Sequence, residues 1–188
     1  MQVDKNADSS SDIDLLVDRA IDGDADAFGR LYDMHVDRVY RHIYYRVGNV
    51  TDAEDLTQAV FIRAWQAIHR YKRTSSRFLA WLIKISHNIV IDFYRSNKTK
   101  VFLDFDVANI KSDSSPELLA ETHFDQLELR RAILELPGNQ QQVILMRFIE
   151  GFSYSEIAAS IGKSEGTVRV ILHRALLRMR KILEKVRQ

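Results

Sequence analysis

Basic and polar side chains near the C-terminus are the residues of this chain with the clearest chemistry. At about 100° per residue, a helix beginning near Thr167 has one apolar arc and an opposite arc that carries most of its charge. That opposite arc consists of Thr167, Arg169, Val170, His173, Arg174, Arg178 and Lys181. From Lys163 to Arg187 there are eight Lys or Arg residues against two Glu, a local net charge of +6. Positive charge concentrated on one helix is what contacts to nucleic-acid phosphates require.

The residues before this helix predict the turn that would position it. Ser153 and Glu156 have the spacing of a capping box, which starts a short helix. Gly162 is suited to ending that helix in a left-handed conformation, and Ser164 can cap the next one. The stretch Phe152–Arg180 therefore predicts a helix-turn-helix, whose second helix can lie in a DNA major groove. Hairpins with solvated basic faces also occur in proteins that bind no DNA, so the pattern alone leaves both interpretations open.

A second candidate site lies on the helix predicted for Phe78–Arg95. One stripe of this helix carries Trp81, Lys84, Asn88, Asp92 and Arg95. A neighbouring apolar stripe carries Phe78, Leu82, Ile85, Ile89 and Phe93. A tryptophan beside amide and basic groups can stack on an unpaired base and hydrogen-bond its edge. In the alternative interpretation, Trp81 belongs to the core and Asn88 is an ordinary surface residue.

The composition limits the class of protein. Of 188 residues 46% are hydrophobic, which supports folded cores, and the absence of cysteine excludes disulfides and thiolate metal sites. No apolar run approaches the ~20 residues that span a bilayer, and the acidic N-terminus is unlike a signal peptide. With seven Gly and two Pro, the chain has too few turn-forming residues for a β-rich fold. We therefore expect an all-α cytoplasmic protein without membrane insertion, metal or cofactor.

Charge and periodicity divide the chain into two helical modules. Residues 1–12 are polar and acidic and predict a disordered tail. Residues 13–96 predict a first module, with helices over Ala25–Val47 and from a Thr51–Glu54 capping box to about His69. Residues 97–125 have too few periodic apolar positions for a domain and predict a flexible linker. Residues 126–188 predict a second module, in which Asn139 can cap a helix running to Glu150.

Three stretches together resemble the extracytoplasmic-function sigma factors of the sigma-70 family, small bacterial initiation factors with only sigma regions 2 and 4. They are DAEDLTQAVFIRAWQAIHRY (52–71), FLAWLIKISHNIVIDFYR (78–95) and LPGNQQQVILMRFIEGFSYSEIAASIGKSEGTVRVILHRAL (136–176). The resemblance implies that residues 13–96 are region 2, which binds core polymerase and recognises the −10 element. It implies that residues 126–188 are region 4, which recognises the −35 element. The chain would then be a specificity subunit and not an enzyme.

The resemblance also implies roles for single residues. Asp55 and Gln58 would contact the clamp coiled coil of the largest polymerase subunit, although Ala59 stands where the family usually has Glu. The implied −10 contacts, which capture a flipped base, are Tyr71, Lys72, Arg73, Lys84 and Asn88. The implied −35 contacts are Thr167, Arg169, Val170, His173 and Arg174, with Arg178 and Lys181 nearer phosphates. The implied partners are core RNA polymerase (including the flap of its second-largest subunit), promoter DNA and an anti-sigma factor.

Two rival functions remain at this point. A stand-alone helix-turn-helix transcriptional regulator would bind its operator without polymerase. A helical protein–protein adaptor would bind no DNA. Within the first hypothesis, Val170-Ile171 is the least family-like feature, because many relatives have Ser-Arg there. Val170 could still meet a thymine methyl group, so we expect a −35 preference that differs from that of better-known members.

Overall fold

The computed structural model describes residues 5–72, 77–96 and 127–186. The first module contains α1 (Lys5–Ile21), α2 (Ala25–Val47), α3 (Val50–Ala67), the 3-10 turn η1 (Ile68–Arg70) and α4 (Phe78–Ser96). The second contains helical residues 127–134, α6 (Gly138–Ile144), the π-helix η2 (Leu145–Ile149), α7 (Tyr154–Ile161) and α8 (Glu165–Val186). The described residues form helices and no strand, which confirms the predicted all-α fold of two helical modules.

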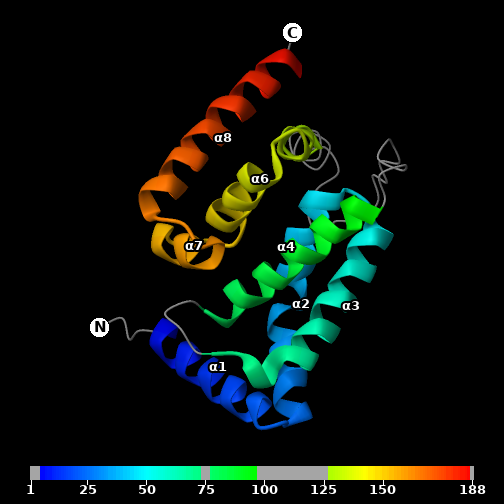
Figure 1. Cartoon of the computed structure of the whole chain (residues 1–188), viewed down its shortest axis with the longest axis vertical. Coiled ribbons are helices and arrows are strands. Elements are labelled where there is room, and N and C mark those ends of the chain that lie inside the picture. The colour runs from blue at the N-terminus through cyan, green and yellow to red at the C-terminus, as the bar shows by residue number, and fades with distance from the viewer. Residues whose placement is uncertain (1–4, 73–76, 97–126, 187–188) are drawn as a thin grey trace, which may run out of the picture.

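Local caps define the long helix of the first module. Asp24 starts α2, because its side-chain Oδ1 accepts a hydrogen bond from the backbone N–H of Ala27 at 3.0 Å. Gly48 ends α2 at φ +85°, a left-handed conformation that glycine adopts without strain. Helices α2, α3 and α4 pack together, and α1 lies against α2 and η1 (Figure 1).

The turn predicted for the second module is present. The Ser153 hydroxyl accepts from the backbone N–H of Glu156 at 3.2 Å, and the Glu156 carboxylate accepts from that of Ser153 at 2.8 Å. This capping box starts α7, and Gly162 ends it at φ +65°. The Ser164 hydroxyl then accepts from the backbone N–H of Thr167 at 3.2 Å at the start of α8. These four residues fix the angle between the two helices of the helix-turn-helix.

Three local expectations were wrong. Helix α1 begins at Lys5, eight residues before the predicted start at residue 13, because extending a helix that is already nucleated costs little. Asn49 rather than Thr51 caps α3, accepting from the backbone N–H of Asp52 at 2.9 Å, because asparagine is the stronger capping residue. Helix α6 begins at Gly138, after Pro137 and not after Asn139, and its first amides bond the Pro137 carbonyl.

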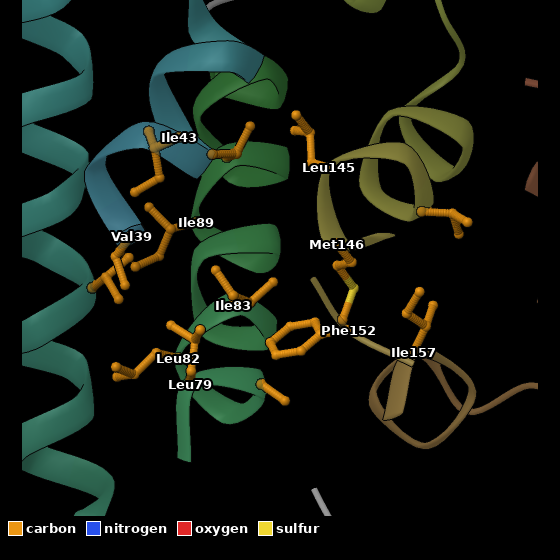
Figure 2. Packing of buried hydrophobic residues seen from close by; sticks show 14 of the residues in the cluster. Val39, Ile43, Leu79, Leu82, Ile83, Ile89, Leu145, Met146, Phe152 and Ile157 are labelled. Carbon is orange, nitrogen blue, oxygen red and sulfur yellow. The ribbon is translucent and has the colours of Figure 1, made fainter. Parts of the chain in front are cut away.

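The two modules pack directly against each other. In Figure 2, the ring of Phe152 of the second module points toward α4 beside Ile83, Met146 lies next to Phe152, and Leu79 lies on the same helix as Ile83. All four side chains are buried, none more than 2% exposed. Helix α4 is therefore covered on two sides, by α2 and α3 and by the second module. The expected linker, residues 97–125, lies outside the described residues.

Within the described ranges, no helix is both long and apolar enough to span a bilayer.

Candidate nucleic-acid interface

The predicted reading side of α8 faces away from the rest of the module. The apolar arc is buried, with Val168 and Ala175 at 0% exposure, Leu172 at 5% and Met179 at 8%. The opposite arc is exposed, and it includes all of the predicted −35 residues: Thr167, Arg169, Val170, His173, Arg174 and Arg178. Val170 is 49% exposed, so its methyl groups are available to a partner. One side of α8 thus holds the helix in place and the other is open to ligand.

A tyrosine at the start of α7 holds one of these arginines. The Arg169 guanidinium lies over the ring of Tyr154, 4.2 Å from its centroid, and Arg147 lies 5.0 Å from the same centroid. Arg147 also donates a hydrogen bond to the Phe152 carbonyl at 2.8 Å. Tyr154 and Arg147 are not among the predicted site residues, because both precede α8 and no single helical wheel contains them together with Arg169. The signal that could have found them is an aromatic and a basic residue flanking the capping box.

Lys84 and Asn88 are exposed on α4, one turn apart. Trp81, one turn before Lys84, is half-buried in an aromatic cluster, with ring centroids 4.9 Å from Tyr71 and 5.5 Å from Phe78. The structure therefore places Trp81 partly in the core, and its ring is fixed by its neighbours. Tyr71 is half-buried and Lys72 is exposed. Arg73, predicted to contact the same DNA, lies outside the described residues.

A buried arginine and a partly buried histidine lie behind the side of α4 that exposes Lys84 and Asn88. Arg46 of α2 is 2% exposed, and its Nη1 lies 3.1 Å from Nδ1 of His87, the neighbour of Asn88 in α4. Burial lowers the pKa of Arg46 to about 10 and that of His87 to about 4, so at neutral pH the guanidinium donates and Nδ1 accepts. The Tyr94 hydroxyl donates to the Arg46 carbonyl. These contacts join α4 to α2 and fix the orientation of its exposed side.

A groove between α3 and α4 adjoins the predicted polymerase contacts. Asp55 and Gln58 are both exposed, and they lie on the same side of α3 as position 62 because residues three and four apart are neighbours on a helix. The groove has a volume of about 330 Å³ and is lined by Ala59, Ile62, Arg63, Gln66, Ile89 and Asp92. Ile62 is 59% exposed. Apolar positions therefore extend around more of α3 than its core contacts cover.

Comparisons with known proteins agree with this architecture. The family models Sigma-70 region 2 and Sigma-70, region 4 match residues 31–100 and 126–179. The ECF RNA polymerase sigma factor BldN of Streptomyces coelicolor is 38% identical over an alignment of 174 residues, and the match covers 89% of this chain but only 64% of BldN. The ECF RNA polymerase sigma factor SigW of Bacillus subtilis is 33% identical over 171 residues, 86% of this chain and 91% of SigW.

A solved structure shares the fold. The sigma factor RpoE from Bartonella quintana, solved in complex with the anti-sigma factor NepR, has a TM-score of 0.67 at 22% identity, covering 84% of this chain and 96% of RpoE. The fold and the two matched regions define the class of the chain as the sigma-70 family. Within that class, it belongs to the extracytoplasmic-function RNA polymerase sigma factors.

Proposed function

We propose that the chain confers promoter specificity on core RNA polymerase. It binds the polymerase, recognises the −35 element as duplex and traps an unstacked base of the −10 element. It acts as a specificity subunit and performs no catalytic chemistry. The observation that carries the proposal is that each of the two modules exposes a helix side with basic and polar groups: the outer arc of α8 and the Lys84–Asn88 side of α4.

Helix α8 reads the −35 element in the major groove. Thr167, Arg169, Val170, His173 and Arg174 face the base edges, and Arg178 and Lys181 approach phosphates. Arginine can form bidentate bonds to guanine, and the exposed Val170 supplies an apolar contact suited to a thymine methyl. Ile171, which stands where many relatives have Arg, is half-buried. Its side chain is thus turned toward the module core, and one basic contact available to those relatives is missing here.

Helix α4 and the preceding segment hold the −10 base. Asn88 hydrogen-bonds the base edge, Lys84 and Lys72 neutralise nearby phosphates, and Tyr71 stacks on the base from the edge of its aromatic cluster. Stacking on an aromatic side chain contributes about 1–3 kcal/mol per base, which is comparable to the mean of about 1.4 kcal/mol per stacking step of duplex DNA. Trapping one or two bases can therefore offset the local cost of melting.

The outer side of α3 docks on the polymerase. Asp55 and Gln58 supply polar contacts, and the groove around the exposed Ile62 accepts an apolar side chain of the clamp coiled coil. An apolar groove beside polar groups is the usual composition of a protein–protein contact. The groove also accounts for Ala59, because apolar area buried in it takes the place of the polar interaction that the family's Glu would make.

An anti-sigma factor regulates the chain. This part of the proposal follows from family membership and from the complex in which RpoE was solved.

Transcription with purified core polymerase tests the function. On candidate promoter DNA the chain should produce specific transcripts only together with core polymerase. Asn88→Ala should reduce promoter opening, followed by permanganate reactivity of unpaired thymines, while leaving binding to −35 duplex unchanged. Asn139→Ala, the same change at an exposed position of the second module, is the control. Operator-type binding that core polymerase does not alter would instead favour a stand-alone regulator, and an unchanged opening rate in Asn88→Ala would remove the −10 assignment.

A further inference from the structure

Arg46 is a buried cation without an acidic partner. Its side chain lies in the last turn of α2 and is 2% exposed. Among the residues that the structure describes, its guanidinium hydrogen-bonds one group, Nδ1 of His87, which lies 3.1 Å from its Nη1. Its Nε is buried and has no partner there. Burying a charge without a counter-charge opposes folding, so stability alone does not account for this arginine.

The contact fixes where the proton of the His87 ring lies. A guanidinium has hydrogen-bond donors and no acceptor, so Nδ1 of His87 must accept and the proton of the neutral ring is on Nε2. Burial, together with the charge of Arg46, lowers the pKa of His87 from 6.5 to about 4. His87 is therefore a neutral donor at Nε2 at physiological pH and does not titrate there.

No negative charge acts on this contact from the helices packed around it. From α2 comes His42, which is fully buried and whose pKa burial holds well below its usual range. On α4 itself, the Tyr94 hydroxyl donates to the Arg46 carbonyl, and burial raises the pKa of Tyr94. Asp52 of α3 acts on Tyr94 and not on His87. The protonation of His87 is thus set by its burial and by Arg46.

The donor of His87 opens beside the residues proposed to hold the −10 base. Lys84 and Asn88 are exposed, and His87, which adjoins both on the helix surface, is half-buried. Nε2 of His87 has no partner in the described part of the chain. It is not enclosed by the protein either, unlike both ring nitrogens of His42. One nitrogen of the ring is therefore bound to α2, and the other presents its N–H to solvent next to Asn88.

A neutral N–H donor at this place suits an acceptor of a DNA strand. About half to two thirds of protein–DNA hydrogen bonds go to phosphate and sugar oxygens, and Lys84 in the same stripe supplies a positive charge. Because Arg46 holds the ring, little side-chain freedom is lost when Nε2 binds. The charge of Arg46 behind the ring also polarises the N–H, which strengthens its bond to a negatively charged oxygen.

We propose that His87 is a further contact to −10 DNA, donating from Nε2 to an acceptor atom of the single strand, and that Arg46 is the positioning residue that keeps the proton on Nε2. The inference rests on the proposed function, because it places this acceptor beside the base that Asn88 holds.

Two substitutions of His87 separate a DNA contact from a structural role. The holoenzyme, formed from the full chain and core polymerase, is titrated with a fluorescent non-template-strand oligonucleotide of a promoter that it transcribes. His87→Asn keeps an acceptor for Arg46 where Nδ1 lies and removes the outer donor, so it should weaken binding by about 2–10-fold, the equivalent of one hydrogen bond. His87→Gln places an amide N–H near the position of Nε2 and should retain most of the affinity. A structural role predicts the reverse order, because in His87→Gln it is Arg46 that loses its partner.

The role of Arg46 is tested by the pH dependence of the same binding. Arg46→Met removes the charge behind the ring, so the pKa of His87 should rise toward 6.5. Relative to the parent chain, affinity should then increase as the pH falls from about 8 to about 5.5, because a protonated ring donates with a positive charge. Adding His87→Asn should abolish this increase. Arg30→Met, the same change at an exposed position of α2, should keep the parent profile. Circular dichroism confirms that each variant retains its helices.

The proposal is overturned if His87→Asn binds the oligonucleotide as the parent does, or if His87→Gln loses as much affinity as His87→Asn. Loss of binding in Asn88→Ala with parent-like binding in His87→Asn would leave the proposed function standing without this contact. The opposite result would remove Asn88 from the −10 site and retain His87. Methylphosphonates at single phosphates locate the acceptor: if one of them abolishes the difference between the parent and His87→Asn, the acceptor is that phosphate, and otherwise it is on a base or sugar.

Discussion

Acid should destabilise the first module through His35. The ring of His35 is 5% exposed, packs against Phe78 with centroids 5.6 Å apart, and has no hydrogen-bond partner on either nitrogen. Burial, with a smaller effect of Arg38, lowers its pKa from 6.5 to about 4. The folded form therefore resists protonation, whereas the unfolded chain accepts a proton near pH 6.5. The contribution of neutral His35 to the free energy of unfolding is therefore fully present above pH 6.5, and it is lost as the pH falls from 6.5 to about 4.

The magnitude follows from the two pKa values. At about 1.4 kcal/mol per pH unit, the free energy of unfolding should fall by about 3 kcal/mol from His35 alone between pH 7 and pH 4. A loss of that size is a large fraction of the ~5–15 kcal/mol that stabilises a typical domain. His42 is fully buried and its pKa is held well below its usual range by burial, so it acts in the same direction.

Urea unfolding followed by circular dichroism at a series of pH values measures this effect. His35→Leu keeps a side chain of similar size and removes the titrating group. Its stability should therefore fall less than that of the parent chain on acidification, by about 3 kcal/mol at pH 4. At neutral pH it should be no less stable, because two unpaired buried nitrogens are removed. His69→Leu, the same change at an exposed ring, is the control. Parallel profiles for the parent and His35→Leu would show that His35 is hydrated or paired in solution.

Three further predictions concern the helix-turn-helix. Arg174→Ala should weaken binding to −35 duplex, measured by fluorescence anisotropy, and reduce the slope of log K against log salt by about 1. Arg180 pairs with Glu184 at 2.7 Å, so Arg180→Ala should change both the affinity and the slope less. Ser153→Ala should lower the free energy of unfolding by about 1 kcal/mol in urea melts, because the amide of Glu156 loses its cap; an unchanged midpoint would mean that water replaces the hydroxyl. Tyr154→Leu should weaken −35 binding by about 2–5-fold, the equivalent of one exposed cation–π contact, while Tyr154→Phe should not. Equal losses in both Tyr154 variants would show that the hydroxyl, and not the ring, positions Arg169.

Local sequence signals predicted most of the helices. Helix α2 runs over the predicted residues Ala25–Val47, because an acidic cap and a glycine mark its two ends. The capping box at Ser153 and the left-handed Gly162 were predicted for the same reason: both depend on residues within one turn of each other. The start of α3 was misplaced because two good capping residues, Asn49 and Thr51, compete there and only one can be the cap.

The candidate site was predicted only where one helix contains it. The exposed residues of α8 and the Lys84–Asn88 pair follow from the 3.6-residue period. The period does not predict that Tyr154 lies beneath Arg169, or that the exposed Ile62 lies in a groove. Both features depend on how separate segments are placed.

Sequence by itself determined the helices, their caps and the side of α8 that faces solvent, because these depend on neighbours within a few residues. Tertiary structure alone decided that Leu79, Ile83 and Val90 of α4 are buried in addition to its predicted stripe. Helical periodicity shows that a side is apolar, but it cannot show that a second module covers it. The pairing of Arg38 with Glu150 across 112 residues has the same origin, since charges on two helices carry no local sign of their partner.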